Sequence, residues 1–283
     1  MKRFVTPMLH MNSPLGISLL SVVLTSAVPV TCNAYSGEGN MKYSLAFVGM
    51  SMDYKEYDPS NTLLDSENSS LGKITGYDMS LGYLFNRKDS SIDEAAMNVS
   101  MLNGKSDYVG SVLGGGGSYG SVINTTTNRF IDASLSYKHT KRYQDFLDLS
   151  YGLGMGYHSW YRELSSSQSE LYEWYSLRPM VGATIVMDKF SFGISGEYQY
   201  GFNATMHSSN PSANFKLGGA DVVAIGFPLR YSYSKSLEFY TQYTLSKQSI
   251  KKSDNVQSGG TTYYEPDSTG YQNYLKIGAT FKF

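Results

Sequence analysis

The chain has 283 residues, a formal net charge of −1 and a single cysteine, Cys32. The balanced charge provides no basic surface of the kind that binds nucleic acid, and one cysteine excludes an internal disulfide and a Cys-rich metal site. Aromatic residues and glycine are abundant, with 25 Tyr, 13 Phe and 28 Gly. After the N-terminal region, no apolar run is long enough for a membrane-spanning helix.

Residues 1–34 have the layout of a secretory signal peptide. Two basic residues stand near the start, an apolar stretch runs from about Leu15 to Val30, and small residues precede a cleavage point after Ala34. We therefore expect an exported mature domain over residues 35–283. An N-terminal membrane anchor is the alternative, although the apolar run falls short of a full span.

Ten segments of the mature domain have the features of β-strands. The pattern is clearest late in the chain, where Phe192, Ile194 and Tyr198 alternate with polar or small residues. This period of two predicts strands with one apolar and one polar face. The segments lie near 41–55, 72–86, 93–107, 129–142, 146–161, 172–187, 190–204, 217–233, 236–250 and 271–283.

The last of these strands ends the chain on an aromatic residue. Its apolar face carries Tyr271, Leu275, Ile277, Phe281 and Phe283. This ending resembles the C-terminal strand of Gram-negative outer-membrane β-barrels. The resemblance implies that these five residues form the signal read by the barrel-assembly machinery. It also implies that the protein lies in the bacterial outer membrane, in contact with its lipid and with lipopolysaccharide.

The connections between the strands support a barrel. Short connections alternate along the chain with longer ones that are rich in Ser, Asn, Gly and Thr. Transmembrane barrels show this alternation because their periplasmic turns are tight and their extracellular loops are long. We therefore predict an all-β, transmembrane antiparallel up-and-down barrel of ten strands, with eight or twelve less favoured. A soluble β-sandwich is the alternative, but strands of about ten to fifteen residues suit a tilted membrane span better.

The more polar face of each strand is predicted to point into the barrel. Acids and bases on that face are nearly matched, so we expect them to pair with one another or with water. Lys276 has Glu238 on the neighbouring strand as one candidate partner. A ten-stranded barrel then has a narrow or interrupted passage lined by a mixed-charge network. The predicted network is Asp78, Asp132, Lys138, Asp148, Arg178, Glu197, Arg230, Glu238 and Lys276.

Two aromatic groups flank the connection between the fifth and sixth predicted strands. Such residues typically anchor a barrel at the membrane interfaces, and stacking on a sugar is the alternative. The predicted interface aromatics are Tyr157, Trp160, Tyr161, Tyr172, Trp174 and Tyr175.

The sequence offers no convincing catalytic site. The omptins, ten-stranded outer-membrane proteases, are similar in size and strand count, but they rely on an Asp-x-His pair that this chain lacks. His207 and Ser209 have the spacing that resembles lipid A 3-O-deacylases, in which a His activates a Ser nucleophile. No acidic residue follows Ser209 closely, and the four His show no metal-ligand spacing. We therefore expect no enzyme activity, no cofactor and no metal.

Two functions are compatible with these features. The first is a porin-like barrel that lets a small solute pass through a narrow, mixed-charge lumen. The second is a structural or adhesive surface barrel whose long loops bind partners. An outer-membrane enzyme, of the deacylase or omptin type, is a distant third.

Overall fold

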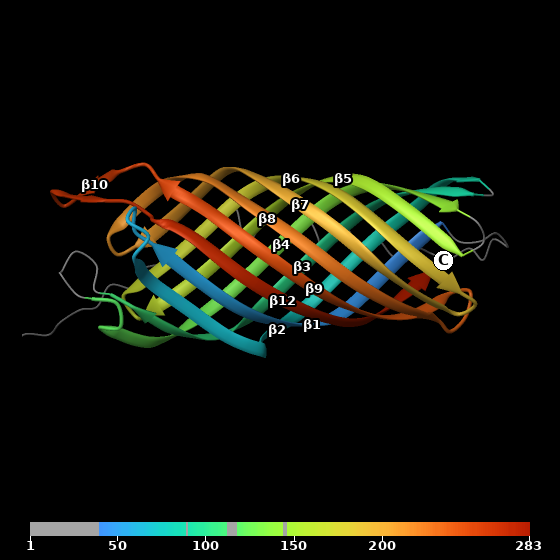
Figure 1. The fold of residues 1–283 in the computed structure, drawn as a ribbon, viewed down its shortest axis with the longest axis horizontal. Helices are drawn as coiled ribbons and strands as arrows, with labels where there is room; N and C mark the ends of the chain where they lie inside the picture. Colours follow the sequence, from blue (N-terminus) through green and yellow to red (C-terminus); the bar gives the residue numbers. More distant parts are fainter. Residues whose placement is uncertain (1–39, 89, 112–117, 144–145) are drawn as a thin grey trace, which may run out of the picture. The chain divides into compact units, whose positions relative to one another are not determined.

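The computed structural model describes residues 40–88, 90–111, 118–143 and 146–283. Within them, ten long strands form one closed barrel and two short strands form a separate hairpin (Figure 1). The predicted signal peptide, residues 1–34, lies outside the described residues. In the part of the chain that the structure describes, no helix is long and apolar enough to cross a membrane.

The strands run antiparallel, and the barrel order is β1-β12-β9-β8-β7-β6-β5-β4-β3-β2. This confirms the predicted ten-stranded up-and-down barrel. The barrel strands are β1 (Met41–Tyr57), β2 (Leu63–Lys88), β3 (Ser91–Gly110), β4 (Val122–Tyr143), β5 (Leu147–Ser165), β6 (Gln168–Met187), β7 (Phe190–Ser209), β8 (Ser212–Ser232), β9 (Leu237–Ser253) and β12 (Asp267–Lys282). The separate hairpin consists of β10 (Val256–Ser258) and β11 (Thr261–Tyr263).

The first and last strands close the barrel. β1 pairs with β12 from Lys42↔Lys282 to Tyr57↔Asp267. Beyond this ladder, Met41 and Phe283 exchange two backbone hydrogen bonds of 3.2 and 2.9 Å. The closure leaves no free strand edge, which a membrane would not tolerate because an unpaired backbone group has no water partner there.

Several strands extend beyond their predicted bounds, most of all at the end of the barrel that carries the long loops. β2 begins at Leu63, where the sequence predicts a start near residue 72, and β8 begins at Ser212 in place of 217. The polar segments of these loops pair with neighbouring strands and so continue the ladder. In β2 the extension contains a register shift between Asn68 and Ile74. The sequence pattern does not predict the β10–β11 hairpin.

The outer face of the barrel carries a band of exposed apolar side chains, here called the apolar belt. A bilayer core requires such a band on the lipid-facing side of a barrel. Closer to the long-loop end, the same outward face carries charges such as Lys55, Arg129 and Glu163. The belt includes Leu45, Phe47, Tyr77, Leu81, Ile131, Leu135, Leu153, Met155, Leu177, Val181, Phe192, Ile194, Ile225, Phe227, Phe239, Leu245, Ile277 and Phe281.

Candidate functional site: the barrel interior

The inward faces of the strands carry all nine of the predicted lumen charges, and six of them form three ion pairs with one another. Each pair joins side chains that lie far apart in the sequence or on adjacent strands. Pairing of this kind offsets the cost of holding charge away from bulk water. The pairs are Lys276 Nζ–Asp78 Oδ2 at 2.6 Å, Arg178 Nη1–Asp132 Oδ1 at 2.8 Å and Arg230 Nη1–Glu238 Oε1 at 2.8 Å.

Lys276 does not pair with Glu238, the candidate partner named from the sequence. Although the two strands are neighbours, Glu238 lies opposite Thr280, four residues along β12 from Lys276. Lys282 is closer to this level of the barrel and pairs with Glu238 at 3.1 Å. The ammonium of Lys276 instead reaches Asp78 on β2.

The other three predicted charges have partners outside the predicted set. Lys138 lies 3.0 Å from Glu94, and Asp148 accepts a 2.7 Å hydrogen bond from Arg142. Glu197 accepts a hydrogen bond from the amide of Gln199. Several of these side chains are accessible to solvent, including Lys138 at 40% and Arg230 at 38%. The half of the barrel nearer the short turns is therefore a polar vestibule that water enters.

A histidine marks the inner end of this vestibule. Arg178 donates to both carboxylate oxygens of Asp132, each at 2.8 Å, and His158 Nδ1 lies 3.3 Å from Asp132 Oδ2. The other face of His158 stacks on Trp174, with ring centroids 4.1 Å apart. Arg178 donates to both oxygens of Asp132 and so balances its negative charge. We therefore interpret this group as a structural ion pair of the barrel interior.

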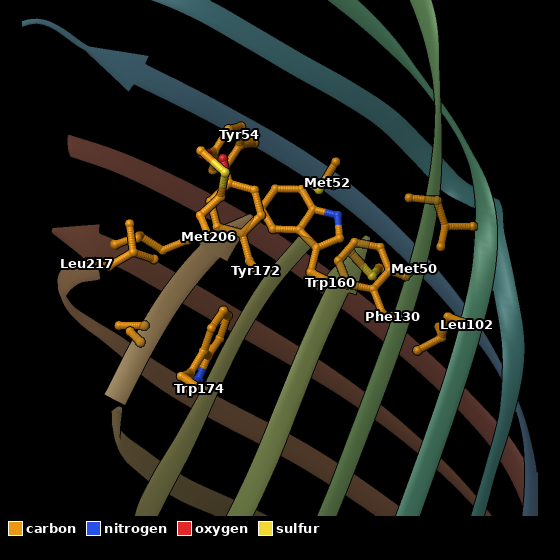
Figure 2. Close-up of a cluster of buried hydrophobic side chains, with 14 of the residues drawn as sticks. Met50, Met52, Tyr54, Leu102, Phe130, Trp160, Tyr172, Trp174, Met206 and Leu217 are labelled. Carbon is orange, nitrogen blue, oxygen red and sulfur yellow. The ribbon is translucent and has the colours of Figure 1, made fainter. Parts of the chain in front are cut away.

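Beyond His158 the interior is filled by the aromatic plug, formed by Phe130, Trp160, Tyr172 and Trp174 (Figure 2). Trp160 stacks between Phe130 and Tyr172, at centroid distances of 5.5 and 5.2 Å. Aromatic pairs of this geometry add to the stability gained from burial alone. Apolar side chains from the facing strands complete the cluster, including Met50, Met52, Ile74, Leu102, Met206, Phe215, Leu217 and Ile250.

For three of the six aromatic residues, the predicted position at the membrane interface is therefore wrong. Trp160, Tyr172 and Trp174 are at most 1% exposed and point into the barrel. Their partners in the prediction, Tyr157, Tyr161 and Tyr175, lie on the opposite, outward-facing parity. Grouping the residues by proximity in sequence hides this division, because adjacent residues of a strand point to opposite faces.

Above the plug, toward the long-loop end, the interior contains a cluster of charged residues that the sequence analysis missed. We call Arg162, Glu56, Glu67 and Glu170 the Arg162 cluster. Arg162 is 1% exposed, and its guanidinium lies 2.9 Å from each of the three carboxylates. Its planar face also lies over the ring of Tyr54, at 4.8 Å from the centroid.

The Arg162 cluster ties together strands on opposite sides of the barrel. Arg162 is on β5, whereas Glu56 and Glu67 are on β1 and β2, three or more strands away in the barrel order. Glu67 also accepts hydrogen bonds from Ser106 and from Asn128, the latter at 2.6 Å. Asn128 in turn accepts a 2.7 Å hydrogen bond from Trp160 Nε1, so the cluster and the plug form one connected structure.

The His-x-Ser pair does not form a catalytic arrangement. His207 and Ser209 lie at the long-loop end of β7 and point away from the interior. His207 Nδ1 lies 2.7 Å from Asn214 Oδ1, and Ser209 Oγ accepts a hydrogen bond from the backbone of Ser169. In the described ranges, no group of three or more His, Cys, Asp or Glu residues is arranged to hold a metal ion.

A cavity of about 370 Å³ lies at the long-loop end of the barrel. Its walls carry hydroxyl and amide groups and two tyrosines, without a charged side chain among the described lining residues. The lining residues include Tyr108, Asn124, Leu164, Gln168, Asn210 and Tyr263.

No family description and no curated protein sequence matches this chain. Its structure is similar to the outer-membrane protease OmpT from Escherichia coli, with a TM-score of 0.55, 10% identity and coverage of 86% of this chain and 97% of OmpT. It is also similar to the transport unit of the autotransporter AIDA-I from Escherichia coli, with a TM-score of 0.45, 10% identity and coverage of 94% and 97%. The translocator domain of the autotransporter NalP from Neisseria meningitidis has a TM-score of 0.40, 9% identity and coverage of 95% and 97%.

Similarity at these identities shows the fold alone. The closed ten-stranded barrel with its outward apolar belt has the fold of a bacterial outer-membrane β-barrel, as predicted. The outward apolar belt is the surface that a lipid bilayer requires of such a barrel, in agreement with the predicted place in the outer membrane.

Proposed function

We propose that the protein is a closed outer-membrane barrel that acts at the cell surface through its long-loop end. The observation that carries this proposal is the aromatic plug. Trp160 and Tyr172 are fully buried in the interior, and Trp174 is 1% exposed. A barrel with few strands leaves an interior that side chains can fill, whereas an open aqueous channel requires many more strands.

The arrangement of polar groups along the barrel supports the same function. By the usual topology of such barrels, the short turns face the periplasm and the long loops face outward. The hydrated vestibule then opens toward the periplasm and ends at His158. The long-loop end carries the cavity lined by tyrosines and amides, which are groups suited to contacts with an external partner.

The porin-like function predicted from the sequence is the second candidate, and the vestibule favours it. Its paired charges and the exposed Lys138 and Arg230 resemble the lining of a narrow passage. A solute that entered it would have to displace Trp160 and the Arg162 cluster, which side chains from opposite walls hold in place. Passive passage would therefore require a rearrangement of the interior.

Conductance of the purified, refolded barrel in a planar lipid bilayer tests the proposal. We expect no steady single-channel conductance, because the buried side chains of the plug and the Arg162 cluster lie across the interior. A variant with Trp160→Ala and Trp174→Ala provides the matched comparison, since it removes the two largest rings from the plug. Steady conductance of the unmodified protein would overturn the closed-barrel proposal and favour the porin-like function.

A further inference from the structure

The segment of residues 254–266 at the long-loop end, here called the hairpin segment, is anchored at its base to the barrel wall. It carries β10 and β11, which mark one end of the molecule in Figure 1. At the base, Ser253 N donates to Glu265 O at 2.9 Å, and Glu265 N donates to Ser253 Oγ at 2.8 Å. Val256 and Tyr263 pack against the buried apolar cluster. The segment is thus in direct contact with the interior of the barrel.

One side chain of this segment reaches across the barrel. The carboxyl group of Glu265, which is 6% exposed, lies 2.5 Å from the hydroxyl of Tyr172. Glu265 lies two residues before the start of β12, and Tyr172 is on β6, so the contact joins parts of the wall that β7, β8 and β9 separate. This contact holds the hairpin segment to the opposite side of the barrel.

The charges around this contact do not balance. Glu56, Glu67, Glu170 and Glu265 supply four carboxyl groups, against the single guanidinium of Arg162. All five side chains are buried. Burial of an excess of negative charge is costly, and the usual relief is that a carboxyl group keeps its proton.

The contacts of Tyr172 also indicate that one carboxyl group keeps its proton, and they do so independently of any charge count. Its hydroxyl oxygen lies 3.2 Å from Glu170 Oε2 and 2.5 Å from Glu265 Oε1, and it accepts a hydrogen bond from Arg162 Nη1. A hydroxyl has one proton and can donate to only one of the two carboxyl groups. The other contact is a hydrogen bond only if that carboxyl group is protonated and donates to the tyrosine oxygen.

We propose that the hairpin segment is a pH-sensitive element of the cell surface. When the Glu170–Tyr172–Glu265 group holds its proton, the segment stays seated on the barrel interior. When the proton leaves, the carboxylates repel one another and Glu265 moves out toward water. The segment then separates from the buried apolar cluster while the barrel wall remains closed.

The pKa shifts of the groups beyond the apolar belt agree with this mechanism. Burial, with added repulsion from Glu56 and Glu170, raises the pKa of Glu265 well above its usual range. Burial also raises the pKa of Glu170 to about 6 and that of Asp65 to about 7. The titratable and charged groups facing this region are Tyr54 and Glu56 on β1, Asp65 and Glu67 on β2, Tyr108 on β3, Arg162 on β5, Glu170 and Tyr172 on β6, and Lys252 on β9.

The direction of the pH effect follows from these shifts. An acid whose pKa is raised in the seated state binds more protons there than in the released state. Its contribution to the seated state is complete below the ordinary carboxyl pKa. It is lost as the pH rises through about 6, the pKa of Glu170, and on toward the higher pKa of Glu265. The segment is therefore seated in acid and released in alkali.

Thiol accessibility measures the release. In a Cys32→Ser background, Val256→Cys places a thiol on the face that packs against the interior, and Thr261→Cys places one on the exposed part of the same hairpin. We compare the modification rate of the Val256→Cys variant, divided by that of the Thr261→Cys variant, across pH. Dividing the two rates cancels most of the pH dependence of thiol chemistry. We expect that ratio to rise about tenfold or more between about pH 5 and about pH 9.

Glu265→Gln is the matched control, because it keeps the size and hydrogen-bonding capacity of the side chain but cannot titrate. In this variant the repulsion between Glu170 and residue 265 is absent, so the ratio should rise far less with pH than in the parent protein. A constant ratio in the parent protein, or the same rise in Glu265→Gln, would overturn the proposal. Hydrogen exchange of residues 255–265 in the protein without engineered cysteines provides a second measurement of the same release, and the heat-dependent gel mobility of folded barrels checks that each variant is folded.

Discussion

At the scale of the single residue, Arg162 is the side chain on which the interior depends most. It pairs with carboxylates from β1, β2 and β6 in a region that solvent does not reach. Replacing one partner of a buried ion pair leaves the others uncompensated and costs about 3–5 kcal/mol. We therefore expect Arg162→Met to lower the free energy of unfolding in lipid vesicles, measured by urea titration, by roughly that amount.

Arg129→Met is the matched control for this prediction. Arg129 points outward beside the ring of Tyr161, at 5.6 Å, and an exposed contact of this kind contributes only about 0.5–1 kcal/mol. Equal losses in the two variants would mean that the Arg162 cluster contributes no more than a surface contact.

Individual residues also show where the sequence pattern is informative and where it is not. Parity correctly predicts that Asp132, Arg178 and Lys276 face inward, since the period of a strand is local. It cannot predict which charges meet, because Arg162 finds Glu67 at a separation of 95 residues. Arg162 shares the inward parity of Trp160, and consistent use of parity in this strand would have placed both inside.

At the scale of the strand, the apolar belt limits which side chains the outer face accepts. Ile277 is 58% exposed in the middle of the belt face of β12, whereas Thr269 lies on the same outward face beyond the belt. A basic residue at the bilayer midplane costs about 2–4 kcal/mol, against about 0–1 kcal/mol near the interface. We expect Ile277→Arg to destabilise the folded barrel in vesicles by about 2–4 kcal/mol and Thr269→Arg by less than half of that. Similar losses at both positions would contradict the assigned position of the belt.

The parts of the strands that the sequence describes best are those that lie in the belt. In β4 and β7 each apolar residue of one parity faces lipid, so the alternation is clear from the sequence alone. β2 is less regular, because the register shift between Asn68 and Ile74 changes which parity faces inward. Glu67 lies beyond that shift and outside the predicted strand 72–86, so the sequence pattern predicts no orientation for its side chain. Packing between strands, and not local propensity, decides such a shift.

At the scale of the whole molecule, the roles proposed for the vestibule, the plug and the hairpin segment require that the barrel has one fixed orientation in the membrane. The connection between β8 and β9 is short, whereas the hairpin segment extends from the opposite end. Barrels of this fold place short turns in the periplasm and long loops outside. The C-terminal aromatic face, ending at Phe283, is predicted to direct the chain to the assembly machinery that establishes this orientation.

Cysteine labelling of intact cells tests the orientation. In a Cys32→Ser background, Ser258→Cys lies in the hairpin segment and Lys235→Cys lies in the turn between β8 and β9. We expect a membrane-impermeant maleimide to label Ser258→Cys in intact cells and Lys235→Cys only after the outer membrane is permeabilised. The reverse pattern would turn the vestibule toward the cell exterior. In that case the Arg162 cluster and the hairpin segment would face the periplasm, and the hairpin segment would not be an element of the cell surface.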